Sequence, residues 1–417
     1  MKRIIFIKGA IETLGYFSLQ LAEYFSEAGR EVFVWDMQRP SASIDAFEAL
    51  DDPSGSVLVT FNFIGLGQEG QFSRGISNIW DEYGIQKVCI LVDSPVYYYR
   101  QLSSELKNIK LVCIDRYHKQ FIEKMYPEYG EVAFMPLGGN RELSSIFASP
   151  GVIGKGSLCY PPEREIESFD EWKERPIDVL FAGNYVPTGS LEPALAGLGQ
   201  DYRDFLMQTA QDLFDNPSAP LEDTLIKRLT AEFPDCSRDE YLQACYKMVY
   251  IDLYVRSVYR AGIVSAIADR GIRVHCTGKD WDLCPCDHPE NIISTGESVS
   301  SKECLEAMKL AKVSLNMMPW FKAGAHDRVF SAMLMGSCLV SDSSEYLDEI
   351  MPDARYYAKY ELTTPEESAK MAADRVEELL QNMNKTYDIA SSAKGFAFSG
   401  HTWTERAKKV EDILQSL

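Results

Sequence analysis

SLNMMPWFKAGAHDRVFSAMLMGSCLVSD, residues 314–342, is the most informative segment of the chain. Residues 314–317 predict a short buried parallel strand, 319–326 a loop, 327–335 a helix that Gly336 ends, and 338–340 a second strand. Such a helix presents free N–H groups and a partial charge of about +0.5 at its first turn. In an open α/β sheet that turn faces the crevice above the strands, so the segment predicts a phosphate-binding unit.

His326 and Arg328 lie at the start of this predicted helix. A cation at a helix N-terminus is unfavourable unless an anion lies between it and the backbone N–H groups. Local rules tend to break at functional sites, so we favour a ligand over the alternatives of a solvated arginine or an ion pair with Asp327. Asp327 could cap the helix or hold Arg328.

The composition indicates two domains and excludes several partners. A chain of 417 residues exceeds one ordinary core. Its 42 basic and 62 acidic residues give a net charge of −20, which repels nucleic acid and anionic lipid. No run approaches the ~20 apolar residues of a membrane span, and MKRIIFIKG is too short for a signal peptide, so we expect a cytoplasmic protein without an integral membrane segment.

Ten cysteines are scattered along the chain, mostly in apolar runs, as expected for reduced thiols in a cytosolic protein. The exception is CPCDH, residues 284–288, which with Cys276 offers four soft ligands. The C-x-C spacing matches no common zinc pattern. We therefore expect no metal and favour a loop that carries free thiols.

The first half of the chain alternates strand and helix, which predicts a doubly wound, parallel α/β sheet. The expected strands are residues 3–7, 31–35, 56–61, 86–92, 110–114 and 132–135, and the expected helices are 16–28, 98–106 and 118–125.

A breaker-rich stretch, residues 149–176, predicts the connection between two domains. We expect an N-terminal Rossmann-like domain over residues 1–160 and a second over 161–401, with 187–250 as a helical insertion and 402–417 as a final helix. The second domain opens with strand 177–182 and resumes with helix 252–270 and strand 273–277. Ser300–Glu303 and Thr364–Glu367 predict capping boxes, the latter with Pro365 at the first helical position.

Loops that follow parallel strands gather at one edge of the sheet. In the second half, four such loops would meet there, which favours a crevice over isolated tight turns. The predicted donor-binding residues on or beside these loops are Gly183, Asn184, Gly278, Lys279, Trp281, Asn316, Asp327 and Ser343, with Arg328 and His326 as catalytic candidates.

In the first half, strand 86–92 leads into Asp93 and Ser94 at the same kind of edge. Asp93 is a candidate general base toward an acceptor hydroxyl. The alternative, about equally favoured, is that it turns the chain before Pro95. Ser94, Tyr97, Gly9 and Gly139 complete the candidate acceptor side, although Tyr97 and its neighbouring tyrosines also fit an alternation of core and surface.

Several common sites are missing from the sequence. The loop KGAIETLGY after the first strand lacks G-x-G-x-x-G spacing, which disfavours NAD and FAD. There is no G-x-x-x-x-G-K-[ST] and no G-x-S-x-G, which disfavours a P-loop nucleotidase and a common serine hydrolase.

Six motifs carry a family resemblance: VDSP (92–95), CIDRYH (113–118), MPLGG (135–139), DVLFAGNY (178–185), GKDW (278–281) and GAHDRVFSAMLMGSCLVSD (324–342). With them the chain resembles the CgeB-like, spore-maturation-type glycosyltransferases. The resemblance implies an α/β GT-B fold, in which two Rossmann-like domains with doubly wound parallel sheets face a cleft. It also implies that the second domain holds a nucleotide-diphosphate sugar, that the first receives the acceptor, and that the final helix crosses back to the first.

The implied activity is transfer of a hexose-type unit from a UDP-sugar to a hydroxyl of a glycan, protein or small molecule. The nucleotide sugar would be a co-substrate, without a further cofactor or a metal, because GT-B sites use side chains and helix dipoles. Many retaining members carry two glutamates where this chain has Ala323 and Ser331. The alternatives are a non-catalytic GT-B-like partner or a sugar-nucleotide epimerase, and a homodimer is one possible assembly.

Overall fold

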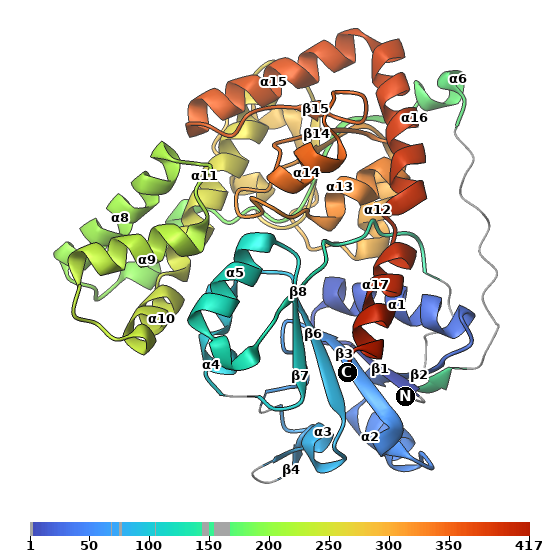
Figure 1. The fold of residues 1–417 in the computed structure, drawn as a ribbon. Helices are drawn as coiled ribbons and strands as arrows, with labels where there is room; N and C mark the ends of the chain where they lie inside the picture. Colours follow the sequence, from blue (N-terminus) through green and yellow to red (C-terminus); the bar gives the residue numbers. More distant parts are fainter. Residues whose placement is uncertain (1–2, 68, 75–76, 105, 144–149, 154–166) are drawn as a thin grey trace. The chain divides into compact units, whose positions relative to one another are not determined.

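The computed structural model describes residues 3–67, 69–74, 77–104, 106–143, 150–153 and 167–417. The chain divides into two compact units (Figure 1). Unit 1 comprises residues 1–163 and 400–417, and unit 2 comprises residues 164–399. The expected boundary at residue 160 and much of the expected connection, residues 149 and 154–166, lie outside the described residues.

Unit 1 is built on a seven-stranded sheet in the order β8-β7-β6-β3-β1-β2-β9. All pairings from β8 to β2 are parallel. The strands are β1 (Arg3–Lys8), β2 (Glu31–Asp36), β3 (Ser56–Phe61), β6 (Gln86–Leu91), β7 (Ile109–Cys113), β8 (Ala133–Phe134) and β9 (Gly151–Ile153). Ile5, Phe33 and Leu58 are fully buried, so this sheet forms the core of the unit.

The expectation of a wholly parallel first sheet is wrong at one edge. Strand β9 pairs antiparallel with β2, with Val32 opposite Ile153. An antiparallel strand needs no crossover helix, so β9 can pair directly with the open edge of β2. Such an antiparallel edge strand is common on an otherwise parallel sheet.

The helices of unit 1 follow the predicted alternation, but α2 and α3 were not among the expected helices and one expected helix is shorter. Pro95 opens a 3-10 turn, Pro95–Tyr98, so the helix expected over residues 98–106 is reduced to α4 (Tyr99–Leu102). The other elements are α1 (Glu12–Glu27), α2 (Pro40–Glu48), α3 (Ile79–Glu82), α5 (Arg116–Met125), α17 (Trp403–Gln415) and the hairpin of β4 (Ser73–Arg74) and β5 (Ser77–Asn78).

The C-terminal helix α17 belongs to unit 1. The rings of Phe17 and Trp403 lie 5.0 Å apart, and Arg406 Nε donates to Leu137 O at 3.2 Å. Gly138 is required where α17 begins, because a Cβ there would lie 2.8 Å from the backbone nitrogen of Trp403. The expected final helix therefore forms and packs against the first unit.

Unit 2 is built on a six-stranded parallel sheet in the order β12-β11-β10-β13-β14-β15. The strands are β10 (Ile177–Ala182), β11 (Val274–Thr277), β12 (Ile292–Ser294), β13 (Ala311–Asn316), β14 (Cys338–Ser341) and β15 (Ala358–Lys359). Counted along the unit, this is the Rossmann order 3-2-1-4-5-6. The strand order reverses between β10 and β13, which is where such folds bind ligands.

The predicted helical insertion is confirmed as α8, α9 and α10, which lie together beside α11 in Figure 1. Ser300 and Glu303 form the predicted capping box of α12, and Thr364 caps α15. The helices of unit 2 are α6 (Phe169–Trp172), α7 (Thr188–Leu191), α8 (Gln200–Asp215), α9 (Leu221–Glu232), α10 (Arg238–Lys247), α11 (Val249–Ala268), α12 (Ser301–Leu310), α13 (Asp327–Leu334), α14 (Glu345–Ile350), α15 (Pro365–Gln381) and α16 (Met383–Gly400).

Candidate functional site

The loops after β10 and β11 form one side of the crevice in unit 2. Gly183 N–H donates to Thr277 O at 2.8 Å, and Lys279 N–H donates to Asn184 Oδ1 at 3.0 Å. Gly278 has φ +142°, and a Cβ there would lie 2.5 Å from Gly183 O. The two loops therefore touch so closely that the position of Gly278 admits no side chain.

Trp281 lies beneath these loops, with 1% of its surface exposed. Its Nε1 donates to Gly183 O at 2.7 Å, and its ring stacks on Tyr185 with the centroids 5.3 Å apart. Trp281 therefore holds the shape of the loop, whereas Lys279 beside it is exposed to solvent.

Two arginines converge on the end of β10. Arg328, at the start of α13, donates through Nη1 to Ala182 O, and Arg260, on α11, donates through Nη1 to Asn184 O at 2.6 Å. Each guanidinium carbon lies 5.9 Å from the centroid of the Phe181 ring. We call Arg260 and Arg328 the arginine pair.

Sequence reasoning missed Arg260. It lies in the middle of a 20-residue helix, where an arginine resembles an ordinary surface residue. The available signal was the repeat of arginine at positions 256 and 260, one helical turn apart on the same face. Its proximity to Arg328 depends on how α11 packs against β10, which no local pattern contains.

Carboxylates favour the charged forms of the arginine pair only from a distance, Asp252 for Arg260 and Asp327 for Arg328. Neither side chain forms an ion pair with any residue that the structure describes. Burial, followed by the charges of Arg256 and Arg328, lowers the pKa of Arg260 well below its ordinary value, and burial also lowers the pKa of Arg328. A bound anion would raise the pKa of both arginines toward its ordinary value. The arginine pair is therefore organised in advance for a negatively charged ligand.

His326 and Asp327 form the first turn of α13. His326 Nδ1 lies 2.7 Å from Asp327 Oδ1 and 3.3 Å from the backbone nitrogen of Arg328. A carboxylate only accepts, so the contact to Asp327 needs a proton on Nδ1, whereas the bond from the Arg328 N–H needs a lone pair on the same nitrogen. The two contacts therefore belong to different tautomers of His326. Burial, then the Arg328 charge, lowers the pKa of His326, which is therefore neutral at pH 7.

Of the two roles expected of Asp327, capping the helix is not what the structure shows, because His326 occupies the N-cap position. The Asp327 charge favours the charged form of Arg328, but the two side chains form no ion pair. The Asp327 carboxylate is turned instead toward the imidazole. The Arg328 guanidinium donates to the Ala182 carbonyl oxygen. This bond offsets the unfavourable interaction between the arginine charge and the N-terminus of α13, and Arg328 stays charged.

The loops after β13 and β14 form the other side of the crevice and are tied together. Met318 N–H donates to Asp342 Oδ1 at 2.8 Å, and Glu345 N–H donates to Lys322 O at 2.8 Å. Asp342 is 2% exposed, and burial raises its pKa to about 6. Together with the contacts between Gly183, Lys279 and Arg328, these bonds show that the four predicted loops do meet at one edge.

Asn316 and Ser343 contribute to this edge in different ways. Asn316 Nδ2 donates to Ser341 Oγ at 3.0 Å, while its Oδ1 is buried and has no hydrogen-bond partner in the structure. Ser343 Oγ donates to Asp348 Oδ1 at 2.6 Å and lies 2.8 Å from the Tyr357 hydroxyl. Ser343 is therefore already engaged, whereas the Asn316 carbonyl oxygen could still accept a bond.

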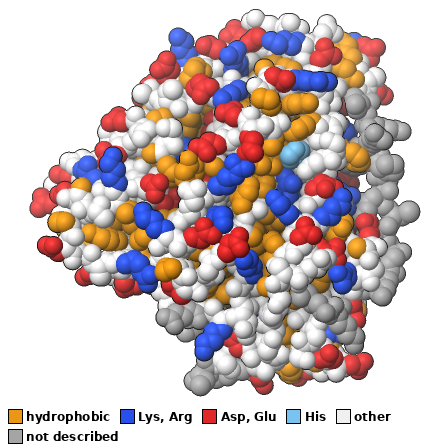
Figure 2. Space-filling view, viewed as in Figure 1, with side chains coloured by type: hydrophobic (Ala, Val, Ile, Leu, Met, Phe, Trp, Pro, Cys, Tyr) orange, Lys and Arg blue, Asp and Glu red, His pale blue; other side chains and the backbone are white. Residues whose placement is uncertain are grey.

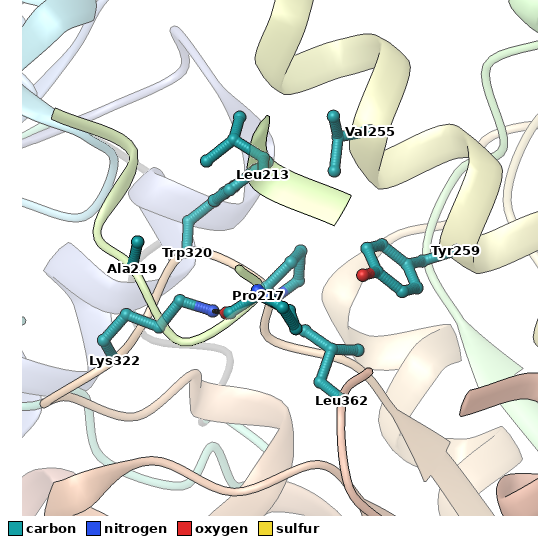
Figure 3. A pocket seen from close by; sticks show the side chains of 9 residues that line it. Leu213, Pro217, Ala219, Val255, Tyr259, Trp320, Lys322 and Leu362 are labelled. Atoms are coloured by element: carbon teal, nitrogen blue, oxygen red, sulfur yellow. Dashed lines mark hydrogen bonds between the residues drawn. The ribbon is translucent and has the colours of Figure 1, made fainter. Parts of the chain in front are cut away.

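The helical insertion braces the loop after β13. Lys322 Nζ donates to Pro217 O on the loop between α8 and α9, as Figure 3 shows. Trp320 lies in the same shallow pocket, lined by Leu213, Val255 and Tyr259. The insertion thus fixes a loop that leads directly to α13.

The carboxyl edge of the unit 1 sheet carries Asp93. Asp93 Oδ2 accepts from Asn62 Nδ2 at 2.8 Å and from the Tyr98 hydroxyl at 3.2 Å. Asn62 also accepts from Val92 N–H, and it adopts φ +48°, a conformation that is uncommon for a residue other than glycine. The carboxylate is therefore held in one orientation while remaining partly exposed.

The remaining acceptor-side candidates lie along the same edge in different environments. Gly9 has φ +88°, and a Cβ there would lie 2.7 Å from Asp36 Oδ1. Ser94 is 5% exposed and caps the turn that contains Tyr97. Gly139 donates its N–H to His401 O at 2.8 Å, so its backbone anchors the returning α17.

The CPCDH loop carries free thiols. All nine described cysteines are free, and Cys286 Sγ lies 3.1 Å from Asp269 Oδ1. Among the described residues, no three His, Cys, Asp or Glu side chains are grouped as a metal site would require.

The surface shows no region of one sign of charge in the view of Figure 2, where basic and acidic side chains are interspersed. None of the described helices combines the length and the apolar character that crossing a membrane requires.

The comparison with sucrose-phosphate synthase agrees with this architecture, and two further solved structures are similar at lower scores. Sucrose-phosphate synthase from Thermosynechococcus elongatus has a TM-score of 0.51 at 10% identity, over 100% of this chain and 99% of that one. T4 phage BGT with UDP-glucose gives 0.45 at 11% identity, over 98% and 99%. Anabaena HepE with UDP and glucose gives 0.43 at 12% identity, over 100% of both chains.

At sequence level, a search of curated proteins finds no match to the chain. Residues 256–412 match the profile of a family described as "Glycosyl transferase-like". That segment contains α13 and Arg260. The chain therefore has the two-domain GT-B fold, and the part of it that carries the arginine pair is glycosyltransferase-like.

Proposed function

We propose that this protein is a glycosyltransferase that binds a nucleotide-diphosphate sugar, in our view a UDP-sugar, at the carboxyl edge of the unit 2 sheet. The observation that carries the proposal is the arginine pair. Two half-buried guanidinium groups without ion-pair partners among the described residues lie at the strand-order reversal, beside the N-terminus of α13. That arrangement suits a diphosphate.

Transfer of the sugar leaves negative charge on the departing diphosphate. In this proposal Arg260, Arg328 and the first N–H groups of α13 stabilise that charge, which is the largest single contribution at many such sites. The close contact of Gly183 and Gly278 fixes the position of the loops beside which the phosphates would lie. Two guanidinium groups and a helix N-terminus supply the positive charge, so we propose a reaction that needs no metal.

In the tautomer that donates from Nδ1 to Asp327, neutral His326 would offer Nε2 as an acceptor for a sugar hydroxyl or for the ribose. Ala323 and Ser331 are each 1% exposed, so neither replaces the glutamates of related enzymes as a contact to the sugar. We assign the remaining donor contacts to Asn184 and Lys279; Asn316 is 2% exposed, so on the same ground we assign it no contact to the sugar.

We propose that unit 1 receives the acceptor and that Asp93 removes the proton from the accepting hydroxyl. Its hydrogen bonds from Asn62 and Tyr98 fix one carboxylate oxygen. The second oxygen is then directed by them toward the substrate. The motifs 92–95, 113–118 and 135–139 also lead us to place the chain among the CgeB-like glycosyltransferases.

The proposal is tested with the full chain and a panel of UDP-, GDP- and ADP-sugars. Saturation at 100 times Kd adds about 2.7 kcal/mol of stability, so the correct donor raises Tm measurably. We expect a UDP-sugar to do so and free UDP to be released slowly by hydrolysis. If no nucleotide sugar shifts Tm, the proposal fails.

Binding without any release of UDP would favour a non-catalytic sugar-nucleotide-binding protein, consistent with the absence of glutamates at 323 and 331. Conversion of one UDP-sugar into another without free UDP would favour an epimerase.

A further inference from the structure

A group of cations surrounds Phe134, the last residue of β8, at the carboxyl edge of the unit 1 sheet. The guanidinium carbon of Arg116 lies 5.1 Å from the centroid of the Phe134 ring, and Lys409 Nζ lies 5.8 Å from it. Arg116 is the first residue of α5, directly after β7, and Lys409 lies on α17. Two separate helices thus bring cations to the same ring.

Arg406 adds a third positive charge. It is 6% exposed and donates to two backbone carbonyls, from Nε to Leu137 O at 3.2 Å and from Nη1 to Gly400 O at 3.3 Å. Its Nη2 lies 3.4 Å from His401 Nδ1. Burial, then Arg406, lowers the pKa of His401 to about 4, so this imidazole is neutral at pH 7 and adds no charge of its own.

Lys409 is the exposed member of this group. It forms no ion pair with any described residue, and Asp412 is the one carboxylate that acts in favour of its charged form. Partial burial, followed by Arg406 and Arg116, lowers the pKa of Lys409. Arg116 and Arg406 thus lie close enough to Lys409 to disfavour its charged form, and an anion bound beside Lys409 would offset that repulsion.

We propose that Arg116 and Lys409, supported by the buried charge of Arg406, bind a phosphate or another dianionic group of the acceptor; we call these three residues the cation cluster. The inference rests on the proposed function and narrows its acceptor to an anionic molecule. The N-terminus of the ten-residue helix α5 lies at the same place and adds favourable dipole ends.

The position of the cation cluster at the end of β8 sets its distance from the reacting hydroxyl. Strand β8 is separated by β7 from β6, which leads into Asp93. Neighbouring strands lie ~4.8 Å apart, so the cluster lies on the order of 10 Å from the candidate base. The anionic group would thus lie at the end of the accepting molecule that is remote from the reacting hydroxyl.

The test measures acetylation of lysines in the full chain by limiting acetic anhydride, read by mass spectrometry. The probes are inorganic phosphate and glucose 6-phosphate, and Lys408 is the matched control because it is exposed, adjacent and paired with Glu405 at 2.7 Å. At ten times Kd, a ligand that shields Lys409 slows its acetylation about tenfold. We expect both probes to protect Lys409 and neither to protect Lys408.

Equal acetylation rates with and without the probes would overturn the proposal. Protection by inorganic phosphate but not by the sugar phosphate would overturn the assignment to an acceptor. The same measurement in Arg260→Met separates the two proposals, because that variant is expected to lose UDP binding while Lys409 remains protected.

Discussion

Replacing Arg260 by methionine should weaken nucleotide binding while leaving the protein nearly as stable as before. A hydrogen bond to a charged group contributes ~1.5–3 kcal/mol, so loss of the contact to a phosphate should raise the Kd for UDP about 10- to 100-fold. In the free protein two effects oppose each other. The variant loses the bond to Asn184 O, about 1 kcal/mol, but it also removes the repulsion between Arg260 and Arg328.

The repulsion between Arg260 and Arg328 is similar in size to the free energy of the bond to Asn184 O. Each guanidinium carbon lies 5.9 Å from the Phe181 centroid, so the two are at most twice that distance apart. Like charges ~10 Å apart repel by ~1.7 kcal/mol at an effective dielectric constant of ~20, and partial exposure reduces this toward 1 kcal/mol. The net change in unfolding free energy is therefore near zero, and methionine retains most of the apolar stem.

The assay is calorimetric titration with UDP together with a thermal melt of the free protein. A Kd within twofold of wild type would refute the role of Arg260. A fall in Tm of more than ~8 °C would show a structural residue instead, since 1 kcal/mol corresponds to ~2–4 °C for a domain of this size. Arg270→Met is the control, because Arg270 follows the same helix but pairs with Asp374 and Glu377, and its UDP affinity should not change.

Three further predictions concern other residues of the two units. Gly183→Ala places a Cβ 2.5 Å from Arg328 Nη1 at a backbone φ of +152°. The variant should therefore lose ~1–2 kcal/mol of stability in thermal melts and bind UDP with a Kd about tenfold higher in titrations. An unchanged affinity for UDP would contradict this prediction. Burial raises the pKa of Asp342 from 3.8 to about 6, so the folded state binds the proton more tightly, and stability is lost as pH rises from 4 through 6. Urea denaturation of Asp342→Asn should lack this loss, about 3 kcal/mol at most, and a slope equal to wild type would exclude Asp342 as its source. Burial and Arg406 lower the pKa of His401 from 6.5 to about 4, so its contribution to folding stability is present above pH 6.5 and is lost as the pH falls toward 4. His401→Asn should reduce this loss of stability in acid. An acid unfolding midpoint equal to that of wild type would count against the prediction.

Strand and helix positions follow from local patterns, and most of them could be predicted. The strand expected over residues 177–182 forms with those bounds, and the predicted insertion is helical, because apolar runs and helix caps act within a few residues. The antiparallel β9 could not be found this way, since a three-residue strand is determined by the open edge of β2 and not by its own sequence.

The candidate site was predictable where residues directly follow strands, as at Gly183 and Asp93. Arg260 and Asn62 were missed for the same physical reason. Each acquires its partner through packing of distant segments, α11 against the end of β10 and β3 against β6. The burial of Trp281 beneath its own loop is likewise a tertiary effect that the motif GKDW does not reveal.

Hydrogen exchange of the full chain with and without saturating UDP tests the central claim most directly. The account predicts slower exchange in the loops after β10, β11 and β13 and in the first turn of α13, residues 183–184, 278–280 and 317–329. Strands of the unit 1 sheet, such as β1, should exchange unchanged. Protection absent from these loops, or confined to another part of the chain, would contradict a nucleotide-sugar site at this edge of unit 2.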